Sequence, residues 1–164
     1  GRVWRGLATA ITVPVIASGV VSVFSLYNPA GSTANLELIS ADLGIVLATT
    51  VVNSVNLYTQ FGIGSNTSIP TSQTVGTPVN AIPGAGGVNQ GKFLTAATHV
   101  GTPTLTAILA TFGAVTSSGD NPVHYEFDGT IILPPASIAS ICMSTAAGTA
   151  SGLALGICWC EWPL

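Results

Sequence analysis

Scarcity of charge is the feature that most constrains what this chain can fold into. Three basic and six acidic side chains make up 5% of its 164 residues, against about 25% in an ordinary soluble domain. No charge falls between Asp42 and Lys92, between Lys92 and Asp120, or between Asp128 and Glu161. Such stretches suit a bilayer or a surface covered by neighbouring protein, because charged residues are depleted at the centres of interfaces.

An apolar run near the N-terminus tests the membrane alternative. Residues 7–26 carry no charge and are long enough to span a bilayer, and Arg2 and Arg5 precede them as in a signal peptide. Pro14 and Gly19 interrupt the run, however, and its Ile, Val and Thr content favours strands. We therefore expect no membrane segment. We also expect no nucleic-acid partner, because three basic residues neutralise too few phosphates.

Short alternating segments separated by Gly, Pro, Asn and Ser recur along the chain and predict an all-β sandwich or barrel. The expected strands lie at 10–16, 21–27, 35–39, 45–58 (one or two), 92–99, 104–115, 123–127, 130–133, 137–144 and 153–162. We place a single domain at 10–164, after an N-terminal arm at 1–9. Residues 61–91 are rich in Gly and Pro and predict a long excursion with one short strand near 75–82.

The C-terminal part carries the clearest pattern. Asp128-Gly129 follows an alternating segment and predicts a tight hairpin turn, because both residues tolerate positive φ. The last strand places Leu, Ile and Trp on one face and Ala154, Gly156, Cys158 and Cys160 on the other. Neither face is polar, so we expect both to be covered, the small-residue face by another layer or subunit.

Two blocks of sequence resemble structural proteins of tailed phages. One runs from Phe127 through Asp128-Gly129-Thr130-Ile131-Ile132-Leu133-Pro134-Pro135 to the ending Trp159-Cys160-Glu161-Trp162-Pro163; the other is Phe24-Ser25-Leu26-Tyr27-Asn28-Pro29-Ala30-Gly31-Ser32. They are similar to head decoration, or cement, proteins. The resemblance implies a jelly-roll sandwich, a homotrimer, and a place on the outer capsid surface after assembly in the host cytoplasm. Its partners would be its own copies and the major capsid protein.

Candidate interface residues lie at the two ends of the chain. Arg2, Val3, Trp4 and Arg5 form a basic, aromatic start suited to an arm on an adjacent subunit, since Trp and Arg are frequent interface hot spots. The alternative for Trp4 is that it closes the domain's own core. Cys158, Cys160 and Trp162 complete the candidate set at the C-terminal end.

Residues that carry chemistry are few. His124, Glu126 and Asp128 alternate along one strand, so a metal bridging two of them, as in a cupin-like metal-binding jelly roll, is one alternative. The competing interpretation is the solvent face of a half-buried strand, and we expect no metal, no cofactor and no enzymatic activity. The three cysteines, which include Cys142, are an odd number and favour buried thiols over a disulfide framework.

A carbohydrate-binding tail or fibre tip is the remaining alternative. Tyr58 and Phe61 border the 61–91 excursion, where aromatic rings would stack on a host-surface glycan. The other aromatic residues fall on strand faces among apolar neighbours, which favours a place in the core.

Overall fold

The structure, a computed structural model, describes residues 2–13, 21–47, 52–60, 72–82, 87–98, 107–115, 123–144 and 151–164. The regular structure in these ranges is entirely β-strand, which confirms the all-β class. The strands are β1 (Arg2–Val13), β2 (Val21–Asn28), β3 (Ala34–Leu47), β4 (Val52–Gln60), β5 (Ser72–Val75), β6 (Val79–Asn80), β7 (Lys92–Thr98), β8 (Ala107–Val115), β9 (Val123–Leu133), β10 (Ser137–Ser144) and β11 (Ser151–Pro163).

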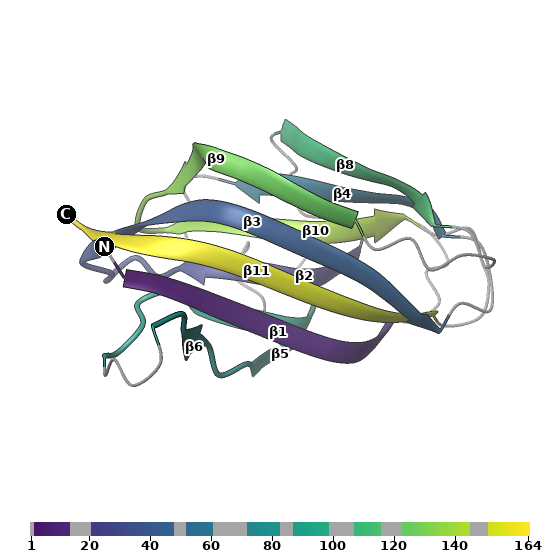
Figure 1. Ribbon diagram of the computed structural model, residues 1–164, viewed down its shortest axis with the longest axis horizontal. Helices are drawn as coiled ribbons and strands as arrows, with labels where there is room; N and C mark the ends of the chain where they lie inside the picture. The colour runs from purple at the N-terminus through teal and green to yellow at the C-terminus, as the bar shows by residue number, and fades with distance from the viewer. Residues whose placement is uncertain are drawn as a thin grey trace.

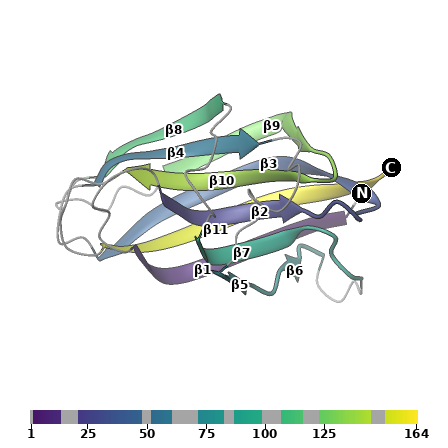
Figure 2. The same cartoon turned by 180° about the vertical axis from the view of Figure 1, so that it is seen from behind.

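The strands form two antiparallel sheets that lie face to face (Figures 1 and 2). The front sheet, nearer the viewer in Figure 1, has the order β6-β1-β11-β3-β9, and the back sheet has the order β5-β7-β2-β10-β4-β8. The pairing is nested: β1 pairs with β11, β2 with β10, β3 with β9 and β4 with β8. β11 and β10 thereby become inner strands, each flanked on both sides.

The core fills the space between the sheets and takes alternate residues from each strand, as the two-residue period of a strand requires. From β11 it takes Leu155, Ile157 and Trp159, of which Trp159 is fully buried. The rings of Phe24 on β2 and Phe93 on β7 meet edge to face, with their centroids 4.4 Å apart. These contacts join the two sheets into one core.

The N-terminal segment differs from the expected arm. Residues 2–8 belong to β1 and pair with β11 from Arg2–Glu161 to Ala8–Leu155. Trp4 is 4% exposed and packs in the core cluster, so it follows the alternative in which it closes the domain's own core. The physical reason is the alternation of Trp4, Gly6 and Ala8, which are buried, with Arg5 and Leu7, which are exposed.

The expected hairpin at Asp128-Gly129 is wrong. Both residues have positive φ, 46° and 72°, but the chain continues along β3 after them instead of reversing. Glu126 pairs with Ser40 and Ile131 with Leu38, so residues 127–130 stand opposite Ile39 alone as a bulge. A side chain at Gly129 would also collide with the carboxylate of Glu37.

The excursion at 61–91 contributes to both sheets where it is described. β5 pairs with β7 at the edge of the back sheet, and β6 pairs with β1 at the edge of the front sheet. Phe93 lies between Gly6 and Gly76, and an added Cβ at Gly6 would come within 2.5 Å of its ring. The strand expected near 75–82 is thus two short strands. Residues 61–71 and 83–86 lie outside the described ranges.

The apolar run at 7–26 supplies the end of β1 and most of β2, and residues 14–20 lie outside the described ranges. Across the part of the chain that the structure describes, no helix has the length and apolarity needed to cross a bilayer.

Truncation of Phe93 tests this account of the core. Phe93→Ala removes a ring that is 1% exposed and should cost about 3–5 kcal/mol of unfolding free energy, since it leaves a cavity between the sheets. Denaturant unfolding measures the change. Val88→Ala, at a side chain that is 76% exposed, is the control and should change stability by less than about 0.5 kcal/mol. Equal losses in the two variants would contradict the assignment.

Candidate functional site

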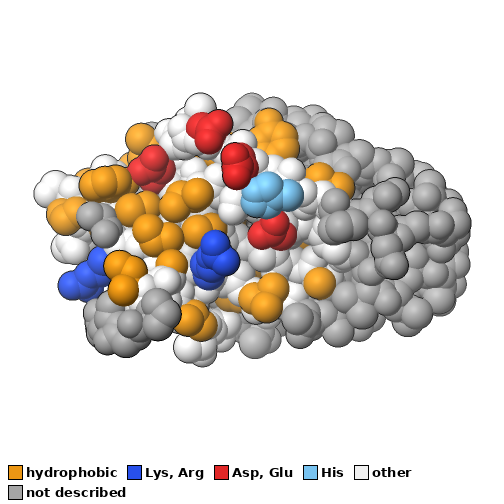
Figure 3. All heavy atoms as spheres, viewed as in Figure 1, with side chains coloured by type: hydrophobic (Ala, Val, Ile, Leu, Met, Phe, Trp, Pro, Cys, Tyr) orange, Lys and Arg blue, Asp and Glu red, His pale blue; other side chains and the backbone are white. Residues whose placement is uncertain are grey.

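The solvent-facing side of the front sheet, which we call the front face, gathers most of the described charged residues (Figure 3). Strand register arranges its side chains in three rows that run from β1 through β11 and β3 to β9. The rows are Val3–Cys160–Glu37–Ile132, Arg5–Cys158–Ser40–Glu126 and Leu7–Gly156–Asp42–His124. Residues between these positions, such as Trp4 and Trp159, point into the core.

Apolar side chains lie exposed on the front face. Leu7 on β1 is 71% exposed and Ile132 on β9 is 57% exposed. Trp162, near the end of β11, is 48% exposed. Its indole N–H donates a hydrogen bond to the carboxylate of Glu37. Figure 3 shows hydrophobic side chains between the basic and acidic ones. An exposed group of this kind, rimmed by polar residues, is typical of a protein interaction site.

Small residues of β11 lie at the centre of the front face, below the longer side chains of the neighbouring strands. Cys158 and Cys160 are each 7% exposed, and the position of Gly156 lets the Asp42 carboxylate lean over β11. Burial raises the pKa of both thiols, although the Arg5 side chain hydrogen-bonded to Cys158 opposes the shift there. Both cysteines are therefore neutral near pH 7 and are poor nucleophiles.

Polar side chains meet at the β3–β9 side of the front face. His124 Nδ1 lies 2.5 Å from Asp42 Oδ1, and its Nε2 lies 3.4 Å from Glu126 Oε1. The hydrogen bond to Asp42, and then the one to Glu126, raise the pKa of His124 above its ordinary value of 6.5. Both ring nitrogens thus face carboxylates.

The candidate metal ligands are only partly brought together. His124 and Glu126 are neighbours, but Asp128 lies in the bulge of β9, beyond Phe127, and takes no part in the cluster. Among the described residues no group of three or more His, Cys, Asp or Glu side chains has an arrangement that would hold a metal ion. Asp42 is the member that sequence reasoning missed, because only the β3–β9 register brings it beside His124.

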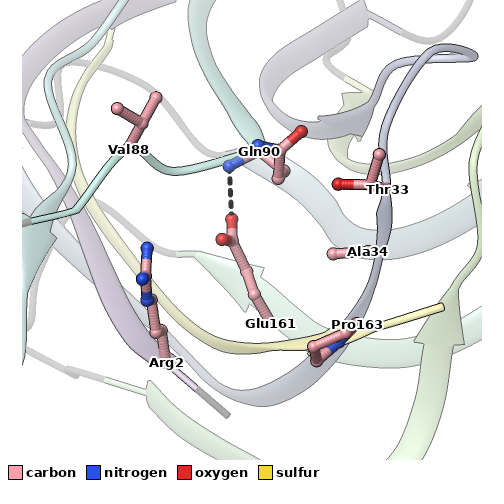
Figure 4. A pocket seen from close by; sticks show the side chains of 7 residues that line it. All are labelled: Arg2, Thr33, Ala34, Val88, Gln90, Glu161 and Pro163. Atoms are coloured by element: carbon pink, nitrogen blue, oxygen red, sulfur yellow. Dashed lines mark hydrogen bonds between the residues drawn. The ribbon is translucent and has the colours of Figure 1, made fainter.

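A pocket of about 450 Å³ is lined by residues near both ends of the described chain, among them Arg2 and Pro163 (Figure 4). Glu161 is 6% exposed, and its Oε1 accepts hydrogen bonds from the backbone N–H groups of Gln90 (2.8 Å) and Gly91 (2.9 Å). The Trp159 indole N–H, 3.3 Å away, is the third donor. Arg2 lines the same pocket. The hydrogen bonds of Glu161 therefore connect the segment before β7 to the end of β11.

The remaining candidates are placed as follows. Val3 and Arg5 lie on the front face, Arg2 lines the pocket and Trp4 is buried in the core. Cys142 lies on β10, but its side chain is outside the described residues, as are the side chains of Tyr58 and Phe61. The glycan-binding alternative falls on these positions.

The pKa of His124 is a test of the cluster. A raised pKa means that the folded state holds the proton more tightly, so this stabilisation is present below pH 6.5 and is lost as pH rises through the folded-state pKa. An NMR titration of the imidazole should therefore show a midpoint above 6.5. Asp42→Asn should lower the midpoint more than Glu126→Gln, and an unchanged midpoint in Asp42→Asn would contradict the geometry.

Replacement of Glu161 tests whether its hydrogen bonds hold the segment before β7 against β11. Glu161→Leu leaves two buried donors, the Gly91 N–H and the Trp159 indole, and the partly buried Gln90 N–H without an acceptor, and it should destabilise the fold by about 2–4 kcal/mol. Glu161→Gln keeps one oxygen acceptor and should cost less. Hydrogen exchange of the Gln90 and Gly91 amides should accelerate in the leucine variant. Unchanged protection of both amides would contradict this role of Glu161.

Comparison of the chain with protein-family models, with curated proteins and with solved structures found no match. What bears on function is therefore the chain's own composition, its fold and the front face.

Proposed function

We propose that this chain is a non-enzymatic structural protein of a tailed-phage virion, an outer capsid decoration protein that binds between capsomers and stabilises the head. The observation that carries the proposal is a sandwich with very few charges whose front face exposes large apolar side chains beside a floor of small ones. Such a surface gains free energy when a partner protein covers it, at about 25 cal/mol per Å² of apolar area.

The nested strand pairing supports a jelly roll. The strands β1 to β4 pair, one by one, with β11, β10, β9 and β8. Successive pairs lie alternately in the front sheet and in the back sheet. A long antiparallel ribbon wrapped in this way produces a double-sheet jelly roll of eight main strands, a fold used by viral capsid proteins. β5, β6 and β7 are then additions at the edges.

The exposure of the His124 cluster suits a place at the rim of an interface. The described partners of His124 are the Asp42 and Glu126 carboxylates, and the side chains of the three are 53%, 60% and 67% exposed, respectively. Exposed hydrogen-bonded charges of this kind suit an interface rim, where they set orientation and specificity.

A rigid sandwich suits binding to many equivalent sites. Its central strands have little conformational entropy to lose on binding, so more of the contact energy contributes to affinity. The partners that we propose are further copies of the chain, as in the homotrimer that the resemblance implies, and the major capsid protein.

Binding to capsids tests the proposal. The purified chain should bind capsids that lack it, in a saturable and stoichiometric manner, and should raise the temperature at which they break open. Leu7→Asp should weaken this binding because it replaces an exposed apolar side chain of the front face with a charged one, whereas Val75→Asp, on edge strand β5, is the control and should bind normally. Both variants should keep the wild-type unfolding midpoint.

Failure to bind capsids at saturating concentration, with no change in capsid heat resistance, would refute the decoration role. Binding to host glycans that survives Leu7→Asp would favour a fibre-tip function instead.

A further inference from the structure

Two opposite charges in the pocket at the chain ends stand on neighbouring strands and do not pair with each other. Arg2 on β1 and Glu161 on β11 are partners in the strand register, and both side chains line the pocket. Arg2 lies two residues before the buried Trp4, and Glu161 two residues after the buried Trp159, so both are on the inner side of the front sheet. Directly opposed side chains on paired strands are close enough to interact. The ion pairs among the described residues are nevertheless those of His124.

The segment before β7 holds the two charged groups apart. It binds Glu161 through the backbone N–H groups of Gln90 and Gly91, both of which donate to Oε1. It also contacts Arg2, since a Cβ added at Gly87 would lie 2.7 Å from the guanidinium Nη1. Figure 4 shows Arg2 reaching toward Val88 and Glu161 reaching toward Gln90. The cation and the carboxylate are therefore held at different points of this segment.

Each charged group keeps a part without a protein partner. All three hydrogen bonds that Glu161 accepts from described residues end on Oε1, so its Oε2 has no donor among them. The residue is nevertheless only 6% exposed, and a buried carboxylate oxygen without a donor costs free energy. The Arg2 guanidinium likewise donates to no acceptor among the described residues. The pocket thus offers an acceptor and a cation to a ligand.

We propose that this pocket binds a zwitterionic α-amino acid, with its ammonium on Oε2 of Glu161 and its carboxylate on the guanidinium of Arg2. Charge balance favours this class of ligand. A simple anion would place its charge beside Glu161, a simple cation would place its charge beside Arg2, and both like-charge contacts cost free energy. A zwitterion meets an opposite charge at each end, and arginine binds carboxylates through two parallel N–H bonds.

The other lining residues favour an amino acid with an apolar side chain. Ala34, Val88 and Pro163 contribute apolar surface to the pocket. Its volume of about 450 Å³ falls in the range of about 300–1,000 Å³ that is typical of small-molecule sites. L-Leucine is therefore a suitable probe.

The inference goes beyond the proposed function and does not depend on it. The pocket residues Arg2 and Glu161 lie on the inner side of the front sheet, whereas the front face is its solvent-facing side. An amino acid in the pocket therefore leaves the front face free for a capsid.

Titration with leucine and two blocked derivatives tests the proposal. NMR should show saturable shifts of the Gln90 and Gly91 amides, which donate to Glu161, and calorimetry should give the Kd. N-Acetyl-leucine lacks the ammonium and leucine methyl ester lacks the carboxylate. Each should bind about tenfold more weakly than leucine or worse, because each loses one charged contact.

Two variants assign the contacts to their residues. Arg2→Gln, at an exposed side chain, should weaken leucine binding about tenfold or more and should abolish the preference for leucine over its methyl ester. Glu161→Gln keeps one oxygen for the backbone N–H groups and should abolish the preference for leucine over N-acetyl-leucine. Arg5→Gln makes the same change as Arg2→Gln on the solvent-facing side of β1 and is the matched control, with unchanged leucine binding.

Three results would overturn the inference: no saturable shift at about 10 mM leucine, equal affinity for leucine and both blocked derivatives, or undiminished binding in Arg2→Gln. Leucine binding by a chain that binds no capsid would refute only the decoration role. Capsid binding without leucine binding would refute only the amino-acid site.

Discussion

The burial of β11 on both faces is the constraint on which the rest of the structure depends. β1 and β3 flank it, Leu155, Ile157 and Trp159 fill the core beneath it, and Cys158 and Cys160 are covered on its other side. A strand in this position has no room for a charge along its length, and its first one is Glu161, which binds backbone N–H groups at the sandwich end. Apart from Glu161, the charges of the front sheet lie on β1, β3 and β9, to either side of β11.

Local alternation predicted most of the strands but not their partners. The sequence predicts β10 with its observed bounds, 137–144, and β11 to within two residues, because the two-residue period is a property of the segment itself. The hairpin predicted at Asp128-Gly129 was wrong, because residues with positive φ suit a bulge as well as a hairpin turn. Pairing with Leu38 and Ser40, far away in sequence, decides between them.

The same limit applies to the candidate site. His124 and Glu126 share a strand face and were predictable as neighbours, whereas Asp42 lies 82 residues before His124 and joins them only through the register of β3 and β9. Asp128 was excluded by a bulge that the alternating pattern does not encode. The segment Arg2-Val3-Trp4-Arg5 resembled an arm because its composition suits an interface, and only the pairing with β11 separates the buried Trp4 from its exposed neighbours.

The bulge in β9 has a consequence for how copies of the chain can add to one another. β9 is an edge of the front sheet, and a long, regular edge offers a row of backbone N–H and C=O groups to any passing strand. Residues 127–130 break that row near its middle, and the hydroxyl of Thr130 turns back to the carbonyl of Phe127. Edge-to-edge addition of further sheets at β9, which would build an unlimited fibre, is thereby discouraged.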